Sequence, residues 1–287
     1  MKDTKTISAN KAGLFQALTE IFRACKGNVV AEDKALEGCA GLVMYEEPVF
    51  GVSSADDPLF NKYKKSSVIG DNFMAPKEWL PEAQSVVSFF LPFTERVCVS
   101  NCADPEKPSP EWLHARIEGQ AFLNAFAKKI KEYFEGLGAK ACVPSLDGRF
   151  GIKVEQLAEG DPEGIHINSK WSERHAAYVS GLGTFCLSRG LISSRGVAGR
   201  YGSIIVSQEI QPDERPYTGI YDYCINCGVC VDKCPAGAIS LEHGKNQLVC
   251  REWVDGSKVR YAPRYGCGKC QVGVPCEHRI PAPAVKG

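Results

Sequence analysis

Eight cysteines stand close together in the last quarter of the chain, and their spacing indicates metal chemistry. The first four are Cys224, Cys227, Cys230 and Cys234, and Pro235 follows directly. Three thiolates, each separated from the next by two residues, hold one face of a [4Fe–4S] cube. The fourth, before a proline, points to a second cube. The spacing therefore predicts iron–sulfur chemistry and a second set of ligands.

The second set is less regular than the first. It consists of Cys250, Cys267, Cys270 and Cys276. The first run has the spacing of bacterial-type ferredoxins, in which the last cysteine of each set binds the other cluster. By this rule we expect cluster A on Cys224, Cys227, Cys230 and Cys276, and cluster B on Cys234, Cys250, Cys267 and Cys270. The late position of Cys276 then changes only the path of the loop that brings this cysteine back to cluster A.

Zinc is the alternative for these cysteines. The pairs Cys224/Cys227 and Cys267/Cys270 together resemble a four-thiolate zinc site. Such a site leaves the other four cysteines without a metal, whereas two [4Fe–4S] clusters use all eight. We therefore favour iron.

The composition limits the class of protein. The chain has 287 residues, 14 cysteines, and 34 basic and 34 acidic residues, so its net charge is zero. Neutral charge gives no overall attraction to nucleic acid, and no apolar run approaches the ~20 residues that span a bilayer. The start of the chain lacks an apolar signal and a twin arginine, so we expect a cytoplasmic protein without a membrane partner. Reduced cytoplasmic thiols favour metal or redox chemistry over disulfides.

The elements that must position the cysteines belong to two predicted domains. Six cysteines are scattered before residue 224, so we expect a boundary near residue 220, with an α+β body over 1–220 and a ferredoxin-like domain over 221–287. In the body we expect helices over 9–25, from Pro110 to a stop at Gly136 or Gly138 with Ser109 as N-cap, and within 171–183. Strands are expected over 84–93 and 202–210, so the body is a sheet with helices packed on it.

One stretch of the body and the cysteine-rich tail together resemble a known superfamily. The stretch contains Glu173-Arg174, then Ala176-Ala177, then Gly181-Leu182-Gly183. With a two-cluster tail behind it, this pattern resembles the epoxyqueuosine reductases and the reductive dehalogenases, which are cobalamin-dependent iron–sulfur enzymes. The segment 265–271, YGCGKCQ, is similar to the second-cluster segment of the reductases. The resemblance covers residues 140–280, and residues 41–93 resemble the N-terminal part of a subgroup from anaerobes.

The resemblance implies an α+β, nitroreductase-like body followed by a bacterial-type two-cluster ferredoxin domain. It also implies a base-off cobalamin between the body and the clusters, which reduce its cobalt to Co(I). The protein then contributes binding, electron delivery and exclusion of water. The candidate cofactor-binding residues are Glu173, Arg174, His175, Gly181, Gly183, Cys186, Arg200 and Tyr201.

The chain also departs from the pattern of the reductases. Where they have a catalytic Asp, this chain reads Ile167-Asn168-Ser169, and Cys186 replaces the last glycine of G-L-G-x-x-G. The chain stops eleven residues after Cys276, so we expect no helical-repeat extension for tRNA. We therefore do not expect queuosine in tRNA as the substrate.

Two residues near the glycine pattern are candidate catalytic groups. The phenol of Tyr178 can act as a general acid, and Asn168 can donate a hydrogen bond to a substrate or to cobalamin. The alternatives are a buried structural tyrosine and an N-cap for the following helix.

The other candidates also have ordinary structural alternatives. Glu173 and Arg174 can form a solvated charge pair, and Cys186 can be a small buried thiol. His175 can bind cobalt as a lower axial ligand or be a satisfied histidine. Cys98 and Cys102 can form a redox couple, but their spacing differs from the C-x-x-C of thiol oxidoreductases.

From the cysteine spacing and the resemblance together, we expect electrons to pass through two [4Fe–4S] clusters to a cobalamin in the body, where a small organic substrate is reduced. The expected partner is a low-potential donor such as a ferredoxin or a flavodoxin. One alternative is an electron-transfer or activation partner of a separate corrinoid protein. Another is an FMN-dependent reductase, because nitroreductase-like bodies can hold FMN.

Overall fold

A four-stranded antiparallel sheet lies at the centre of the computed structural model, which describes residues 11–282. Its order is β1-β2-β8-β3. The strands are β1 (Val49–Ser54), β2 (Ser85–Pro92), β8 (Gly199–Val206) and β3 (Ala141–Cys142). β2 and β8 pair over eight residues, from Ser85 opposite Val206 to Pro92 opposite Gly199. This pairing joins segments more than 100 residues apart in the sequence.

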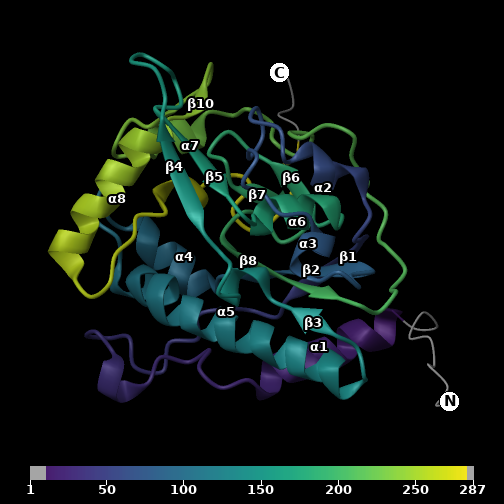
Figure 1. Cartoon of the computed structure of the whole chain (residues 1–287). Helices are drawn as coiled ribbons and strands as arrows, with labels where there is room; N and C mark the ends of the chain where they lie inside the picture. Colours follow the sequence, from purple (N-terminus) through teal and green to yellow (C-terminus); the bar gives the residue numbers. More distant parts are fainter. Residues whose placement is uncertain (1–10, 283–287) are drawn as a thin grey trace, which may run out of the picture.

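Helices cover both faces of this sheet (Figure 1). α1 (Lys11–Ala24) and the long α5 (Pro110–Gly136) lie side by side on one face, and α6 (Glu173–Val179) packs on the other. β2 is therefore buried on both sides: Val87 and Phe89 face α5, while Val86 faces away from it. A strand covered on both faces has a continuous apolar sequence, as the segment 84–93 does.

α5 begins where its sequence predicts. Ser109 is the N-cap, and its hydroxyl accepts a hydrogen bond from the amide of Trp112 at 3.1 Å. Pro110 occupies the first turn, where its missing N–H is not needed. The shorter helices of the body are α2 (Pro58–Lys62), α3 (Pro76–Trp79) and α4 (Glu95–Cys102), with 3₁₀ turns at Glu32–Lys34 and Pro144–Leu146.

Two short hairpins flank the central sheet. One pairs β4 (Ile152–Gln156) with β5 (Ile165–Ser169), and the other pairs β6 (Gly183–Phe185) with β7 (Leu191–Ser193). The second hairpin follows α6 directly and carries the glycine pattern of the sequence.

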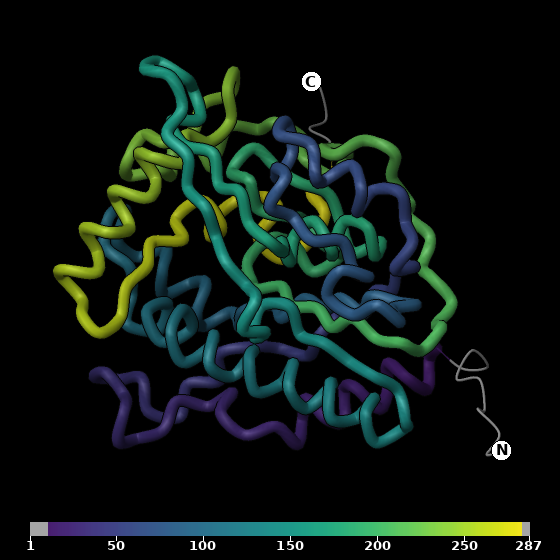
Figure 2. Tube along the Cα trace, viewed as in Figure 1, coloured from purple at the N-terminus to yellow at the C-terminus, as the bar shows by residue number. Residues whose placement is uncertain are grey.

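The cysteine-rich segment packs back onto the body. It contains α7 (Val229–Asp232), a small ladder of β9 (Ile239–Ser240) with β10 (Gly244–Lys245), α8 (Gln247–Tyr261) and a 3₁₀ turn at Lys269–Gln271. Figure 2 shows the chain after α8 returning into the middle of the molecule. Hydrogen bonds fix it there: Asn101 Nδ2 donates to Cys267 O at 2.9 Å, and Val197 N donates to Cys276 O at 2.8 Å.

The mixed helix-and-sheet architecture with a C-terminal cysteine-rich region is the expected fold class. The strand expected over 202–210 instead covers 199–206, because the chain leaves β2 after Val206. The helix expected over 9–25 covers 11–24 in the described residues; positions 9 and 10 lie outside them. The nitroreductase-like body and the boundary near residue 220 stay predictions. No helix between residues 11 and 282 has the length and apolar character needed to cross a membrane.

Candidate functional site

The eight cysteines of the C-terminal region form two groups in space. The first group, set A, lines a small pocket and consists of Cys224, Cys227, Cys230 and Cys276. The second group, set B, lines a larger cavity and consists of Cys234, Cys250, Cys267 and Cys270. Cys270 lines both spaces, so the two sets adjoin at this residue. The cysteine pairs of the zinc alternative are thereby divided, with Cys224 and Cys227 in set A and Cys267 in set B.

The thiols within a set are close enough to influence one another. Burial raises the pKa of Cys267 to about 11, and the nearby thiols of Cys270, Cys250 and Cys234 add to the rise. Burial likewise raises the pKa of Cys276, with its strongest electrostatic neighbours in set A and at Cys186. Four crowded thiols are the donor set of a metal cluster, since a cation stabilises their ionised form.

A cavity of about 740 Å³ separates set B from the body. α5 contributes Trp112, Arg116, Gln120, Leu123 and Asn124 to its wall. These positions recur at helical spacing along one stripe of α5. The hairpin β4–β5, α6 and β8 supply the rest of the body wall, including Glu173, Arg174, Arg200 and Tyr201.

Glu173 is the acid of this cavity. Its Oε2 accepts a hydrogen bond from Ser203 Oγ at 2.5 Å, and Trp171 Nε1 holds that hydroxyl at 2.9 Å. Among the described residues, no donor meets hydrogen-bond geometry with Glu173 Oε1, which is buried. Burial raises the pKa of Glu173 to about 7, and the polar groups of Ser203, Ser145 and Trp171 offset only part of this effect. Near neutral pH the side chain therefore exists in both protonated and ionised forms.

Three other residues predicted to bind the cofactor also line the cavity. Arg174 Nη1 donates to the main-chain oxygen of Arg189 at 2.6 Å. Tyr201 donates its hydroxyl to Leu191 O at 2.9 Å, and burial raises its pKa well above the usual value. Arg200 Nε is buried without a hydrogen-bond partner among the described residues. The structure thus brings Glu173, Arg174, Arg200 and Tyr201 together beside set B.

The two predicted catalytic residues lie elsewhere. Ile167 and Ser169 of β5 line the cavity, so Asn168 between them points to the opposite face of the strand. There Asn168 Nδ2 donates to Asp71 at 3.1 Å. Tyr178 packs against the ring of Tyr217 at 5.0 Å and does not line the cavity. Neither residue is in place to act on a molecule in the cavity.

His175 and the two glycines are also outside the cavity. The ring of His175 packs 4.8 Å from those of Tyr63 and Phe185, and burial lowers its pKa to about 3. Gly181 has φ +79° just after α6 and ends that helix. A Cβ on Gly183 would lie 1.9 Å from Ile192 O. The close approach that the glycine pattern allows is therefore between β6 and β7, not to a cofactor.

Cys186 lies beside set A. It lines the same pocket as Cys224, Cys227, Cys230 and Cys276. Its Sγ is 3.3 Å from Ser188 Oγ, and burial raises its pKa to about 11.

Sequence reasoning missed three cations of the cavity, Arg116, Lys245 and Lys269. Arg116, Gln120 and Asn124 follow Trp112 at steps of four residues on α5, so a row of half-buried polar positions was the available signal. Lys245 lies in the short β10 beside Cys250 and Cys270. Burial opposes its charge, but these thiols hold its pKa above the usual value. No local pattern marks this lysine.

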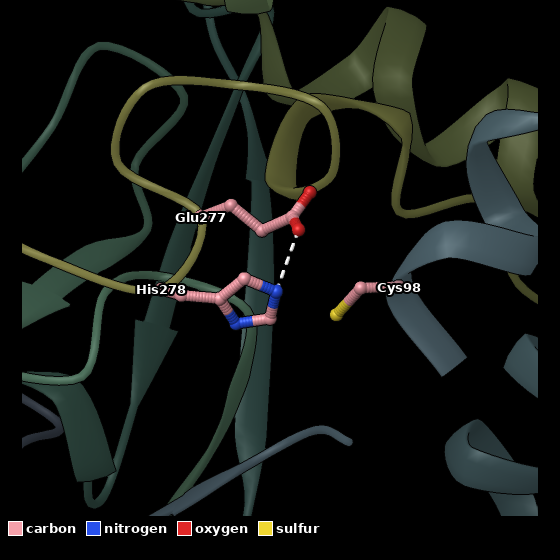
Figure 3. A group of neighbouring side chains, drawn as sticks. All are labelled: Cys98, Glu277 and His278. Carbon is pink, nitrogen blue, oxygen red and sulfur yellow. Dashed lines mark ion pairs between the residues drawn. The ribbon is translucent and has the colours of Figure 1, made fainter. Parts of the chain in front are cut away.

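Cys98 faces the segment that follows set A (Figure 3). Its Sγ and the side-chain ligand atoms of Glu277 and His278 lie within 4.8 Å of one another, and His278 Nε2 pairs with Glu277 Oε1 at 2.6 Å. Burial and then the charge of Glu277 raise the pKa of Cys98 well above the usual value. Because the thiolate is the reactive form, Cys98 is poorly suited to thiol exchange with the exposed Cys102.

Comparison with known families identifies the cysteine run. Residues 217–240 match the 4Fe-4S binding domain family. This match includes Cys224, Cys227, Cys230 and Cys234. A search of curated proteins found no match.

Solved structures with a similar fold come from the two groups that the sequence resembles. Epoxyqueuosine reductase from Streptococcus thermophilus is 18% identical with a TM-score of 0.49, and the match covers 93% of this chain and 66% of that one. A reductive dehalogenase whose structure suggests a mechanism for B12-dependent dehalogenation is 15% identical with a TM-score of 0.48, covering 82% and 30%. A catabolic reductive dehalogenase in complex with 3-bromo-4-hydroxybenzoic acid is 13% identical with a TM-score of 0.50, covering 93% and 37%.

The chain spans just under two thirds of the reductase and little more than a third of the dehalogenase bound to 3-bromo-4-hydroxybenzoic acid. At this level of identity the match concerns the fold alone. The chain shares the fold of the matched 37% of that catabolic reductive dehalogenase and contains a 4Fe-4S binding domain at residues 217–240.

Proposed function

We propose that this protein is an iron–sulfur redox enzyme that passes electrons through two [4Fe–4S] clusters to a molecule in the cavity beside set B. One observation carries the proposal. The thiols of set B and the polar side chains of the body line the same cavity of about 740 Å³. A pure electron carrier needs a cluster near its surface but no such cavity.

The cysteines and their surroundings fit two clusters. Each set supplies four thiols, the number that a [4Fe–4S] cluster requires. Lys245 and Arg174 are positive neighbours of Cys270 in set B and offset the negative charge of a thiolate-bound cluster. Cys227 of set A is exposed. Electrons from a ferredoxin or flavodoxin therefore enter at set A and cross to set B at Cys270.

The cavity also suits a cobalamin, as the sequence resemblance implies. Gln120 and Asn124 offer amide groups, and Trp112 and Trp253 offer flat apolar surfaces. None of the five histidines, all within residues 11–282, lines the cavity. This agrees with base-off binding without a histidine ligand. A bound cobalamin would supply a low-potential, nucleophilic centre for reduction of a small organic substrate.

Glu173 is suited to supply the proton of this reaction. Replacing a leaving group on carbon by hydrogen consumes two electrons and one proton. The clusters deliver the electrons one at a time, and Glu173 is the one acid among the described residues that line the cavity. This role replaces the one that the sequence suggested for Tyr178 and Asn168.

Anaerobic reconstitution followed by titration with hydroxocobalamin tests the proposal. We expect about eight irons per chain and one tightly bound base-off cobalamin. About eight irons without cobalamin binding contradict the cobalamin enzyme. That result leaves the electron-transfer partner of a corrinoid protein, or an FMN-dependent reductase if a yellow chromophore remains after the clusters are removed.

A further inference from the structure

The cavity beside set B is strongly positive although the whole chain is neutral. Its described lining includes one acid, Glu173, and five basic residues, which are Arg116, Arg174, Arg200, Lys245 and Lys269. None of the five forms an ion pair with a carboxylate within residues 11–282. Some of these charged groups nevertheless have other partners, either main-chain oxygens or thiols of set B.

Three of the five are accounted for. Lys269 Nζ donates to the main-chain oxygens of Asn101 at 2.6 Å and Lys107 at 2.7 Å, so it fastens the loop around set B. Arg174 donates to the main-chain oxygen of Arg189, and both Arg174 and Lys245 neighbour thiols of set B. The positive charges of Arg174 and Lys245 would therefore be balanced by a negatively charged cluster at set B.

Arg116 and Arg200 remain without a counter-ion. Arg116 lies over the ring of Tyr265, with Cζ 4.8 Å from the ring centroid, and its Nη2 donates to the Tyr265 hydroxyl at 3.3 Å. Arg200 Nη2 donates to the main-chain oxygen of Arg116 at 3.3 Å, and its buried Nε has no partner among the described residues. The two guanidinium groups come from α5 and β8 and meet at the same wall.

Two neighbouring guanidinium groups repel each other when burial removes them from water. Burial and the charge of Arg200 lower the pKa of Arg116 to about 10, which still leaves it charged at neutral pH. A planar guanidinium group matches the two oxygens of a carboxylate or a phosphate. An oxyanion between them would relieve the repulsion.

We propose that Arg116 and Arg200 form an oxyanion-binding site in this cavity, which takes a carboxylate or phosphate group. Anion binding stands on the arginines themselves. The further statement that the reduced substrate is an anionic organic molecule rests on the proposed function. The same chemistry can come from a phosphate of the cofactor, so the experiment separates these two sources.

The test uses cluster-loaded, cobalamin-free protein, with inorganic phosphate and benzoate as probes. Calorimetry gives the Kd, and anaerobic thermal unfolding gives the shift in Tm. We expect at least one probe to bind, and Arg116→Gln and Arg200→Gln each to weaken it by roughly tenfold or more, because each removes a charge-assisted hydrogen bond. Arg23→Gln is the matched control, because Arg23 lies on the exposed side of α1 and pairs with Glu47. It changes the net charge equally and should leave the Kd unchanged.

A second readout covers variants that are altered in stability. In anion-free buffer we expect Arg200→Gln to have a Tm at least equal to that of the wild type, because it removes an unpaired buried charge. Adding the bound probe should then raise the Tm of the wild type and of Arg23→Gln, but not of Arg200→Gln. Failure of both probes to bind, or equal binding by Arg200→Gln, overturns the proposal.

Repeating the titration with cobalamin present distinguishes the sources. Anion binding that persists beside cobalamin assigns the site to the substrate, and anion binding that cobalamin abolishes assigns it to the cofactor. If no cobalamin binds but the arginine-dependent anion site remains, the proposed function fails while this inference stands.

Discussion

At the scale of single residues, Glu173 shows how position decides chemistry. In the sequence alone, a glutamate before an arginine is equally compatible with a cofactor-binding role and with a solvated charge pair. The fold instead buries its carboxyl group beside Ser203, in the wall of a cavity that also contains the thiols of set B. The raised pKa that follows from this burial is what suits Glu173 to the proton-donor role that we propose for it.

The same burial predicts a pH dependence of stability. Below its ordinary pKa of 4.5, Glu173 is protonated in both the folded and the unfolded chain. Between pH 4.5 and about 7 only the unfolded chain loses this proton, so the free energy of unfolding falls as pH rises. Above this window the loss is on the order of 3 kcal/mol. Glu173→Gln is neutral throughout and should gain Tm relative to the wild type between pH 5 and pH 8.

Thermal unfolding at one scan rate, under anaerobic conditions, measures this difference. Glu252→Gln is the control, since Glu252 is exposed on α8. Parallel pH profiles for the wild type and Glu173→Gln would show that Glu173 is ionised in the folded protein, which removes it as the proton donor.

The sequence could define the cysteines but not all of the residues around them. The spacing of thiolates is a local property, so iron–sulfur chemistry follows directly from Cys224, Cys227, Cys230 and Cys234. The sequence could not show that Asn168 lies outside the cavity, because the face of a strand depends on its pairing, and β4 determines that pairing for β5.

At the scale of elements, the glycine pattern serves the hairpin β6–β7. A Cβ on Gly183 would meet Ile192 O at 1.9 Å, and main-chain atoms have no room to move. We therefore expect Gly183→Ala to destabilise the protein by about 2–3 kcal/mol or more. Gly136→Ala is the matched control. It lies in the last turn of α5 with no atom within 4 Å of the new Cβ, so it should be neutral or stabilise by up to about 1 kcal/mol.

Chemical or thermal unfolding of the two variants gives the comparison, with iron content measured before each run. If Gly183→Ala is as stable as Gly136→Ala, β6 and β7 do not approach as closely as described, and a role of Gly183 toward a cofactor returns.

The elements themselves were predictable where the signals are local. α5 has an N-cap at Ser109, a proline in its first turn and an amphipathic stripe, and each of these can be read along the chain. The pairing of β2 with β8 was not readable, because it joins residues 85–92 to residues 199–206 through non-local contacts. For the same reason the cavity itself could not be foreseen, since α5, α6, β8 and the C-terminal loop meet only in the folded chain.

At the scale of the whole molecule, the net charge is zero but the basic and acidic side chains are unevenly distributed. The equal totals of basic and acidic residues gave no sign of an anion site. Arg116 and Arg200 nevertheless lie in the same wall of the cavity, and neither has a carboxylate partner in the described part of the chain. Set A includes the exposed Cys227, whereas set B opens onto the cavity. In the proposed function, the electron donor and the substrate would therefore approach opposite ends of the two cysteine sets.

The most direct test of this account follows electrons into the cavity. Protein with reduced clusters is mixed anaerobically with one equivalent of hydroxocobalamin, and cobalt reduction is followed by absorption and EPR over a range of protein concentrations. After binding, we expect cobalt to be reduced at a rate independent of protein concentration, because in the proposed function set B and the cofactor share one cavity. A reduction rate that rises in proportion to protein concentration, or no reduction of a bound cobalamin, would contradict the claim that set B delivers electrons into this cavity.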